Sequence, residues 1–279
     1  MSQALIFALL PTLIFSAMWL FASKATKSTS ALKSLFLFQL LGLPVFIFLI
    51  PFMPHGVTLH AMPLLLIGLF YSFVFLLYFY AIKIGNLSII VPISEASVVI
   101  TVVLSVLFLH ESFGLLKAIG TAVLLVGVIG VGLHIQKRSA GILQGVPQVL
   151  LSTLGTGVYF FLVGIAAREN GWFWTALFIR IAIAATAYVL LLIRGQGSNI
   201  FKNVPWKLFI VASILDVIGF SLYNYAVISF EVSYVSLIMT SQALFIAILS
   251  YYFLKEKLRL YQVAAIFLII AGLIALQFH

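Results

Sequence analysis

Long apolar segments alternate with short polar ones along almost the whole chain, and a typical apolar segment has about 20 residues. An α-helix rises ~1.5 Å per residue and the hydrocarbon core of a bilayer is roughly 30 Å thick, so segments of this length can cross it. The pattern therefore predicts an all-α polytopic membrane protein with ten transmembrane helices, at Gln3–Ala22, Ala31–Met53, Met62–Lys83, Leu87–Leu109, Leu116–Leu133, Ile142–Ala167, Phe173–Ile193, Trp206–Ser229, Val232–Leu254 and Leu260–Phe278.

The stretch from Tyr78 to Glu111 has a similar second copy later in the chain, which indicates an internal sequence repeat. A shift of 145 residues brings Tyr78 onto Tyr223 and Glu111 onto Glu256. The same register also pairs Tyr80 with Tyr225, Ala81 with Ala226, Ser88 with Ser233, Ser105 with Ser250 and Gly127 with Gly272. The sequence thus predicts two five-helix repeats, residues 1–135 and 142–279, joined by a linker at 136–141.

Positive charge is distributed unequally between the two sides of the predicted bundle. Five spans per repeat is an odd number, so the second repeat must enter the membrane inverted. One side then collects 12 Lys and Arg residues, and the other collects two, Lys117 and Arg168. The positive-inside rule places both termini outside the cytoplasm. Inverted repeats are typical of secondary transporters, whose binding site lies near the midplane between the halves.

Composition narrows the class of protein further. Hydrophobic residues make up 64% of the chain and charged residues 8%, which excludes a soluble protein and makes the lipid bilayer its surroundings. The net charge of +9 resides mostly in loops, so we expect no nucleic-acid partner. The absence of cysteine excludes disulfides and thiolate metal sites. The first span lacks a positive n-region, so we expect a retained helix rather than a signal peptide.

The fourth predicted span contains Pro and Ser, ends in Phe-Leu-His-Glu at 108–111, and is followed by a Gly-bearing span. The second copy ends in Phe-Leu-Lys-Glu at 253–256 and continues as Lys-Leu-Arg-Leu. These features resemble the EamA family of the drug/metabolite transporter superfamily. The resemblance covers nearly the whole chain and implies a ten-helix transporter in the cell (inner) membrane. It implies a small polar or amphipathic substrate, of the amino-acid or organic-cation type.

The chain departs from this family in three respects. The first span reads Ser-Ala-Met-Trp at 16–19, where Trp-Gly is common. Residues 94–97 read Ser-Glu-Ala-Ser, where members usually carry small and apolar residues. Many members also keep their termini in the cytoplasm, against the charge distribution of this chain. Both orientations therefore remain open, as do a monomer and a homodimer.

Three ionisable residues lie inside predicted spans, where a charge costs several kcal/mol unless it faces a cavity or a partner. Arg180 and Asp216 either form a buried ion pair between the seventh and eighth spans, or Arg180 presents its fork to a substrate carboxylate or phosphate. Glu95 has no obvious cation, and its repeat equivalent is Thr240. We expect Glu95 to face a cavity, where it either binds a cationic group or carries a coupling proton.

Helical periodicity gives the other candidates in the fourth span. At 100° per residue, Ser88, Pro92 and Glu95 share one face, which we expect to line the pathway, with Pro92 as a kink or gating residue. Ser94, Ser97, Thr101 and Ser105 form a second stripe, which we expect to serve close helix packing.

Aromatic and amide side chains complete the candidate site. Several aromatic residues lie within spans, where they form either a cage for an organic cation or ordinary core: Trp19, Tyr78, Tyr80, Tyr159 and Tyr223. Asn224 and Gln242 are candidate hydrogen-bonding groups in the second repeat, whereas Gln39 lies too near the start of its span to rank with them.

No set of residues indicates an enzyme. All five histidines lie in loops or at span ends, and no His-Glu-x-x-His pattern occurs. We therefore expect no catalytic residue, no cofactor and no metal. The favoured function is a secondary transporter of small molecules that works by alternating access, with protons as a candidate coupling ion. The alternative is a non-transport membrane component, such as an assembly partner or a lipid-handling protein.

Overall fold

The computed structural model describes residues 3–56, 58–85, 87–132, 144–254 and 260–276. Within these residues every regular element is a helix. In chain order they are α1 (Gln3–Ser28), α2 (Ala31–Gly42), α3 (Val45–Leu49), η1 (Ile50–Phe52), α4 (Ala61–Ile84), α5 (Leu87–Glu95), α6 (Ser97–Leu109), α7 (Leu115–Gly132), α8 (Val146–Ile193), η2 (Gly197–Asn199), α9 (Trp206–Ser229), α10 (Val232–Met239), α11 (Gln242–Leu254) and α12 (Leu260–Ala275).

The helices follow the apolar segments of the sequence, with four differences in continuity. The second, fourth and ninth predicted spans are each interrupted, as α2–α3–η1, α5–α6 and α10–α11. The sixth and seventh are joined in α8, which turns back at Gly171 with φ 74° and ψ 159°, a conformation open to glycine. Among the described residues, six helical stretches are long and apolar enough to cross a membrane. The linker 136–141 and Glu256 lie outside the described residues.

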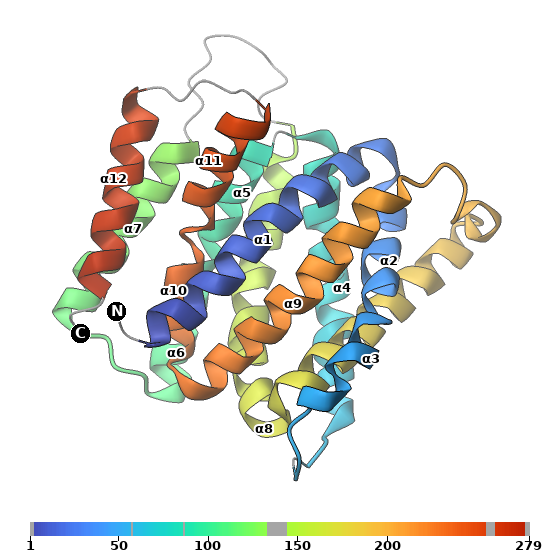
Figure 1. Ribbon diagram of the computed structural model, residues 1–279, viewed down its shortest axis with the longest axis horizontal. Helices are drawn as coiled ribbons and strands as arrows, with labels where there is room; N and C mark the ends of the chain where they lie inside the picture. The colour runs from blue at the N-terminus through green and yellow to red at the C-terminus, as the bar shows by residue number, and fades with distance from the viewer. Residues whose placement is uncertain (1–2, 57, 86, 133–143, 255–259, 277–279) are drawn as a thin grey trace.

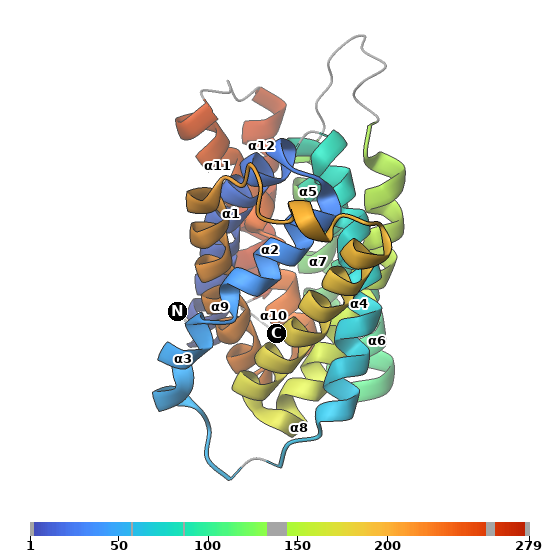
Figure 2. The ribbon, with the colours of Figure 1, turned by 90° about the vertical axis from the view of Figure 1, so that its right-hand side faces the viewer.

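The two halves of the chain start from opposite ends of the bundle. Figure 1 shows α1 beginning at the lower end and α8 beginning at the upper end, and Figure 2 shows the same arrangement from the side. At the left of Figure 1, α7 and α12 lie side by side. A Cβ on Gly127 would lie 2.7 Å from the Ile269 nitrogen, and a Cβ on Gly272 would lie 2.7 Å from the Leu124 nitrogen. The 145-residue shift maps Gly127 onto Gly272 and Leu124 onto Ile269, so each contact is the repeat equivalent of the other. The sequence repeat is therefore also a repeat of contacts.

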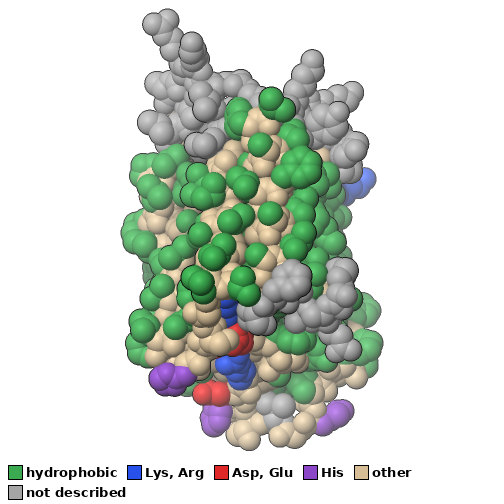
Figure 3. All heavy atoms as spheres, turned by 90° about the vertical axis from the view of Figure 1, so that its left-hand side faces the viewer, with side chains coloured by type: hydrophobic (Ala, Val, Ile, Leu, Met, Phe, Trp, Pro, Cys, Tyr) green, Lys and Arg blue, Asp and Glu red, His purple; other side chains and the backbone are tan. Residues whose placement is uncertain are grey.

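The outer surface is apolar over most of its height. Large hydrophobic side chains are exposed on α1, α4, α6, α7, α8, α9 and α12. Figure 3 shows such side chains spread over the middle of one face, whereas the Asp, Glu and His side chains visible there gather near its lower end. An exposed apolar belt of this kind is stable against lipid but not against water. The fold is that of a multi-pass helical membrane protein.

The two interrupted helices, α5–α6 and α10–α11, share one hydrogen-bonding pattern. The Ala96 and Thr240 N–H groups each donate to the carbonyl three residues earlier, at 3.2 Å, which is a tighter turn than that of an α-helix. Hydroxyl groups also bond to the backbone at both breaks. Ser94, Thr240 and Ser241 each donate to the carbonyl three residues earlier, at 2.7–2.8 Å. Backbone groups released by the breaks are thereby kept satisfied in an apolar setting.

Candidate functional site

A cavity of about 130 Å³ lies in the middle of the bundle, lined by residues from both halves. A water molecule needs roughly 10–15 Å³ of such space, so the cavity has room for several waters or one small solute. Eight of the candidate residues from the sequence line it: Trp19, Tyr78, Glu95, Tyr159, Arg180, Asp216, Tyr223 and Gln242.

Three other candidates do not line the cavity. The Tyr80 side chain is 49% exposed, and its repeat equivalent Tyr225 is 45% exposed. Asn224 is fully buried, and its side-chain nitrogen and oxygen have no hydrogen-bond partner among the described residues. Pro92 is buried within α5, four residues before the break at Ala96.

Pro92 is expected to kink the fourth span, but its equivalent in the second repeat is Leu237. The α10–α11 break occurs at the matching place, at Thr240, without any proline. What the two breaks share is the serine and threonine hydroxyl groups that accompany the tight turn. A break at this place therefore forms in the second repeat without a proline, and the kinking role of Pro92 in the first stays a prediction.

Arg180 and Asp216 form a buried ion pair through the Arg180 Nη2 and Asp216 Oδ2 atoms. The Arg180 Nη1 donates to the carbonyls of Phe38 and Gln39, at 3.1 and 3.2 Å. Both carbonyls lie in the last turn of α2. Pro44 has no N–H, and the Leu43 N–H turns back to Leu40, which leaves the Gln39 carbonyl free to accept from Arg180. The guanidinium thus fastens α8 to both α9 and the bent end of α2.

Glu95 occupies the last position of α5, next to the break, and contributes to the cavity wall. No described residue forms a hydrogen bond or an ion pair with its carboxyl group. The Tyr78 hydroxyl lies close by and hydrogen-bonds with the Ser94 side chain. Glu95 and Asp216 therefore present two carboxyl groups to one cavity, of which one is paired and one is not.

Aromatic rings form much of the remaining wall. Trp19 packs edge-on against Tyr78, with ring centroids 4.8 Å apart and an interplanar angle of 72°. Tyr71 and Tyr159 stack face to face with centroids 3.5 Å apart. Such rings provide an apolar, weakly electronegative surface that suits the body of an amphipathic solute or a cationic group.

Several lining residues were missed by sequence reasoning. Gln39 lines the cavity although it lies only eight residues after the start of α2 at Ala31. Ser94, Ser97 and Thr101 line it too, although their stripe was assigned to helix packing. The stripe does pack closely, since Thr101 donates to the Gly157 carbonyl of α8 at 3.0 Å. The assignment of two separate faces assumed an unbroken helix, and the break at Ala96 invalidates that assumption. Tyr71, Thr156 and Ser236 also line the cavity.

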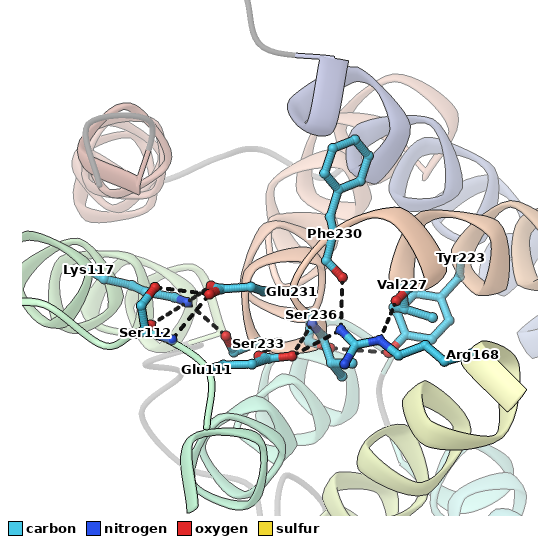
Figure 4. Close-up of polar contacts among 11 residues, drawn as sticks. Glu111, Ser112, Lys117, Arg168, Tyr223, Val227, Phe230, Glu231, Ser233 and Ser236 are labelled. Carbon is cyan, nitrogen blue, oxygen red and sulfur yellow. Dashed lines mark hydrogen bonds and ion pairs between the residues drawn. The ribbon is translucent and has the colours of Figure 1, made fainter. Parts of the chain in front are cut away.

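In the cavity wall, the Tyr223 hydroxyl and the Ser236 hydroxyl lie 3.2 Å apart. Beneath them lies a group of charged and polar side chains that we call the end cluster (Figure 4): Glu111, Ser112, Lys117, Arg168, Glu231 and Ser233.

In the end cluster, the Glu111 carboxylate accepts from the Val232 and Ser233 N–H groups, at 2.7 and 2.9 Å, and from Arg168 at 3.2 Å. These two N–H groups open α10, so Glu111 caps a helix of the other half. Arg168 also donates to the Val227 carbonyl, in the last turn of α9, at 3.0 Å. The end cluster thus holds the α9–α10 connection against the first half of the chain.

Lys117 is fully buried, and it is neutralised within the end cluster. Its Nζ lies 2.5 Å from Glu231 Oε2 and 2.8 Å from the Ser233 hydroxyl. Partial burial alone would raise the pKa of Glu231, but hydrogen bonds from Lys117 and Ser112, together with the Lys117 charge, outweigh it and lower that pKa. Lys117 and Arg168 are the two basic residues on the side predicted to be poor in positive charge, and both are paired with carboxylates.

Among the described residues, no three His, Asp or Glu side chains lie close enough together to hold a metal ion.

Comparisons with known proteins agree with this architecture. The sequence model of the EamA-like transporter family matches residues 2–133 and 143–277. An uncharacterised protein of Methanocaldococcus jannaschii is 44% identical over 54 residues, which is 19% of this chain and 39% of that protein. The chain thus spans well under half the length of this relative. One solved crystal structure superposes with a TM-score of 0.79 at 17% identity, covering 99% of this chain and 98% of the other. At that identity the likeness shows the fold.

Proposed function

Because the chain belongs to the EamA-like transporter family, we propose that it is a secondary transporter that moves a small polar or amphipathic metabolite across the cell membrane. The solute is of the amino-acid or organic-cation type. The observation that carries this proposal is the central cavity, which both halves line and which contains the unpaired Glu95 beside the Arg180–Asp216 pair. Polar groups that converge on an otherwise aromatic cavity are typical of small-molecule binding sites.

The proposed mechanism is alternating access between two inverted five-helix halves, residues 1–135 and 142–279, with ten crossings of the membrane. Support comes from the opposite starting ends of α1 and α8 and from the exchanged contacts of Gly127 and Gly272. The end cluster joins the halves below the cavity, so this cycle requires it to separate when the cavity opens downwards. In a transporter of this type the halves rock around a fixed site.

A non-transport component, such as an assembly partner or a lipid-handling protein, does not need a polar cavity at mid-depth. A packed midplane with Glu95 in an ion pair would have favoured that alternative. Glu95 instead faces open space without a partner among the described residues, which supports transport, and protons remain the candidate coupling ion at this carboxyl group.

The test is solute flux in proteoliposomes that contain the purified protein. Radiolabelled amino acids and organic amines are screened by counterflow, which requires no knowledge of the driving force. Uptake above that of protein-free vesicles for at least one solute is the expected result. Absence of counterflow across both solute classes, with correctly folded protein, would favour the non-transport alternative.

Orientation has its own test, because the chain has no cysteine. Thr58 and Ser198 are both exposed, in connections at opposite ends of the bundle. The charge distribution places Thr58 outside the cytoplasm, so a membrane-impermeant maleimide on intact cells labels Thr58→Cys and spares Ser198→Cys. The reverse pattern would show that cytoplasmic termini, common in the family, hold here as well.

A further inference from the structure

The charges around the cavity do not balance, and this selects between the two solute types proposed above. Among the lining residues, the charged side chains are Glu95, Arg180 and Asp216. Arg180 and Asp216 neutralise each other. Glu95 is left as the one charge without a partner in the described part of the cavity wall.

Arg180 cannot bind an anionic group of the solute unless its existing ion pair and hydrogen bonds are broken. Its Nη1 is engaged by the carbonyls of Phe38 and Gln39, and its Nη2 by Asp216. A solute carboxylate that bound Arg180 would have to displace Asp216, which would then be left buried without a counter-charge. Leaving one partner of a buried pair uncompensated is strongly unfavourable.

We infer that the solute is a monocation with an apolar or aromatic body, rather than a zwitterionic amino acid or an anion. Its cationic group bonds to the Glu95 carboxylate, and its body lies against the rings of Trp19 and Tyr78. This rests on the proposed transport function and narrows its substrate class. Specificity here comes from rejection as well as attraction, since Arg180, the one cationic side chain in the described cavity wall, is already engaged by Asp216 and by two backbone carbonyls.

Two probes, each lacking one charged group of phenylalanine, test this inference directly. 2-Phenylethylamine has the ring and the amine of phenylalanine but lacks its carboxylate, and 3-phenylpropionate has the ring and a carboxylate but lacks the amine. Binding to the purified full chain in detergent is measured by thermal shift, because a ligand that binds the folded state raises the midpoint of unfolding. The expected order is phenylethylamine first, phenylalanine weaker by roughly tenfold or more in Kd, and phenylpropionate without effect.

Variants locate the effect at Glu95. In Glu95→Gln, the shift caused by phenylethylamine is expected to disappear, while Glu95→Asp keeps the charge and retains the preference for the amine over phenylalanine. The matched control is Glu169→Gln, an exposed carboxylate outside the cavity, which is expected to leave the shift unchanged. Because Glu95→Asp keeps the ionic group, its retained preference separates loss of the binding charge from loss of the fold.

Three results would overturn the inference: phenylalanine binding as tightly as the amine, an amine shift that survives in Glu95→Gln, or no shift with phenylethylamine at all. Counterflow separates this inference from the transport proposal. Movement of phenylalanine but not of the amine would leave a transporter with the wrong predicted solute. Amine binding without movement of any solute would uphold the cation site and reject transport.

Discussion

The two halves of this protein contribute the same backbone but different charges to the central cavity. Both halves place an interrupted helix beside it, with the same tight turn and the same hydroxyl-to-carbonyl bonds. At this break the first half carries Glu95 and the second half carries Thr240. The second half alone supplies the Arg180–Asp216 pair, where the 145-residue shift finds Leu35 and Tyr71 in the first.

This difference separates the features required by the repeated architecture from those required to bind the proposed solute. The break recurs in both halves, and in each it places polar side chains at the cavity wall. The charges do not recur, so they are not required by the repeated architecture. One half supplies a neutralised pair that fastens helices together, and the other supplies a charge that is still available.

The largest expected effect concerns the pair of the second half. Arg180→Ala strands the Asp216 carboxylate and should lower the free energy of unfolding by about 3–5 kcal/mol, as for buried pairs in soluble proteins. Removing Asp216 as well should recover part of that loss. A double-mutant cycle on the unfolding free energy in detergent measures the coupling, and additive losses would show that the charges do not act as a pair.

The next effect concerns the unpaired charge of the first half. Glu95→Gln should lower transport by roughly 10- to 100-fold, since a hydrogen bond to a charged group contributes about 1.5–3 kcal/mol. Stability should change little, because no described residue pairs with this carboxyl group. Flux is measured in proteoliposomes beside Glu169→Gln, an exposed carboxylate outside the cavity, which should transport normally. Wild-type flux in the Gln variant would remove Glu95 from the mechanism.

A smaller effect tests how the pair is held. A Cβ on Gly42 would lie 2.2 Å from Arg180 Nη1 and 2.8 Å from a Val217 methyl group. Gly42→Ala should therefore push the guanidinium away from the end of α2, at a cost of about 1–3 kcal/mol for an overpacked core. Gly114→Ala is the matched control, since its Cβ would meet nothing within 4 Å. Equal thermal unfolding midpoints for the two variants would contradict this account of Arg180.

The smallest effect lies outside the cavity, in the end cluster that joins the halves. The pKa of Glu231 is lower in the folded protein, so its ion pair with Lys117 stabilises the fold at neutral pH. That contribution is lost as the pH falls below the ordinary carboxyl range, near about 4.3. For a partly exposed pair it amounts to at most about 1 kcal/mol. Unfolding midpoints between pH 7 and about 3 should fall less in Glu231→Gln than in wild type, with the difference appearing below about pH 4.3, and parallel curves would contradict this.

The helical ranges were predictable because they depend only on the length of apolar segments. Six of the resulting stretches are long and apolar enough to cross a membrane on their own. The interruptions were harder to predict. Pro92 lies near one of them, but the matching break at Thr240 has no proline. Serine and threonine residues within a span do not by themselves predict a break. A break also shifts the faces of the helix beyond it, so the predicted division into two stripes does not extend to Ser97 and Thr101, whereas Ser94 lies before the break and lines the cavity beside Glu95.

The charges of the site were predictable in part. Arg180 and Asp216 stood out as opposite charges inside neighbouring spans, and the ion pair is one of the two readings that the sequence allowed. The carbonyl partners Phe38 and Gln39 were not predictable, because they become available only where α2 ends. The end cluster was missed, since Lys117 and Arg168 were counted only as loop charges. Glu111 carried a signal, because it recurs at the end of a span in both repeats.

Glu111 has a further consequence for how the chain assembles. α10 has no Ser, Thr, Asn or Asp at its own N-cap position, which is occupied by Glu231 without a side-chain cap bond. Its first N–H groups, at Val232 and Ser233, are held by a carboxylate that lies 121 positions earlier in the chain. The start of this helix is therefore completed only when the two halves have docked. Amide hydrogen exchange at Val232 and Ser233 should accordingly report on the docking itself, slow while the halves are closed at this end and faster whenever they part.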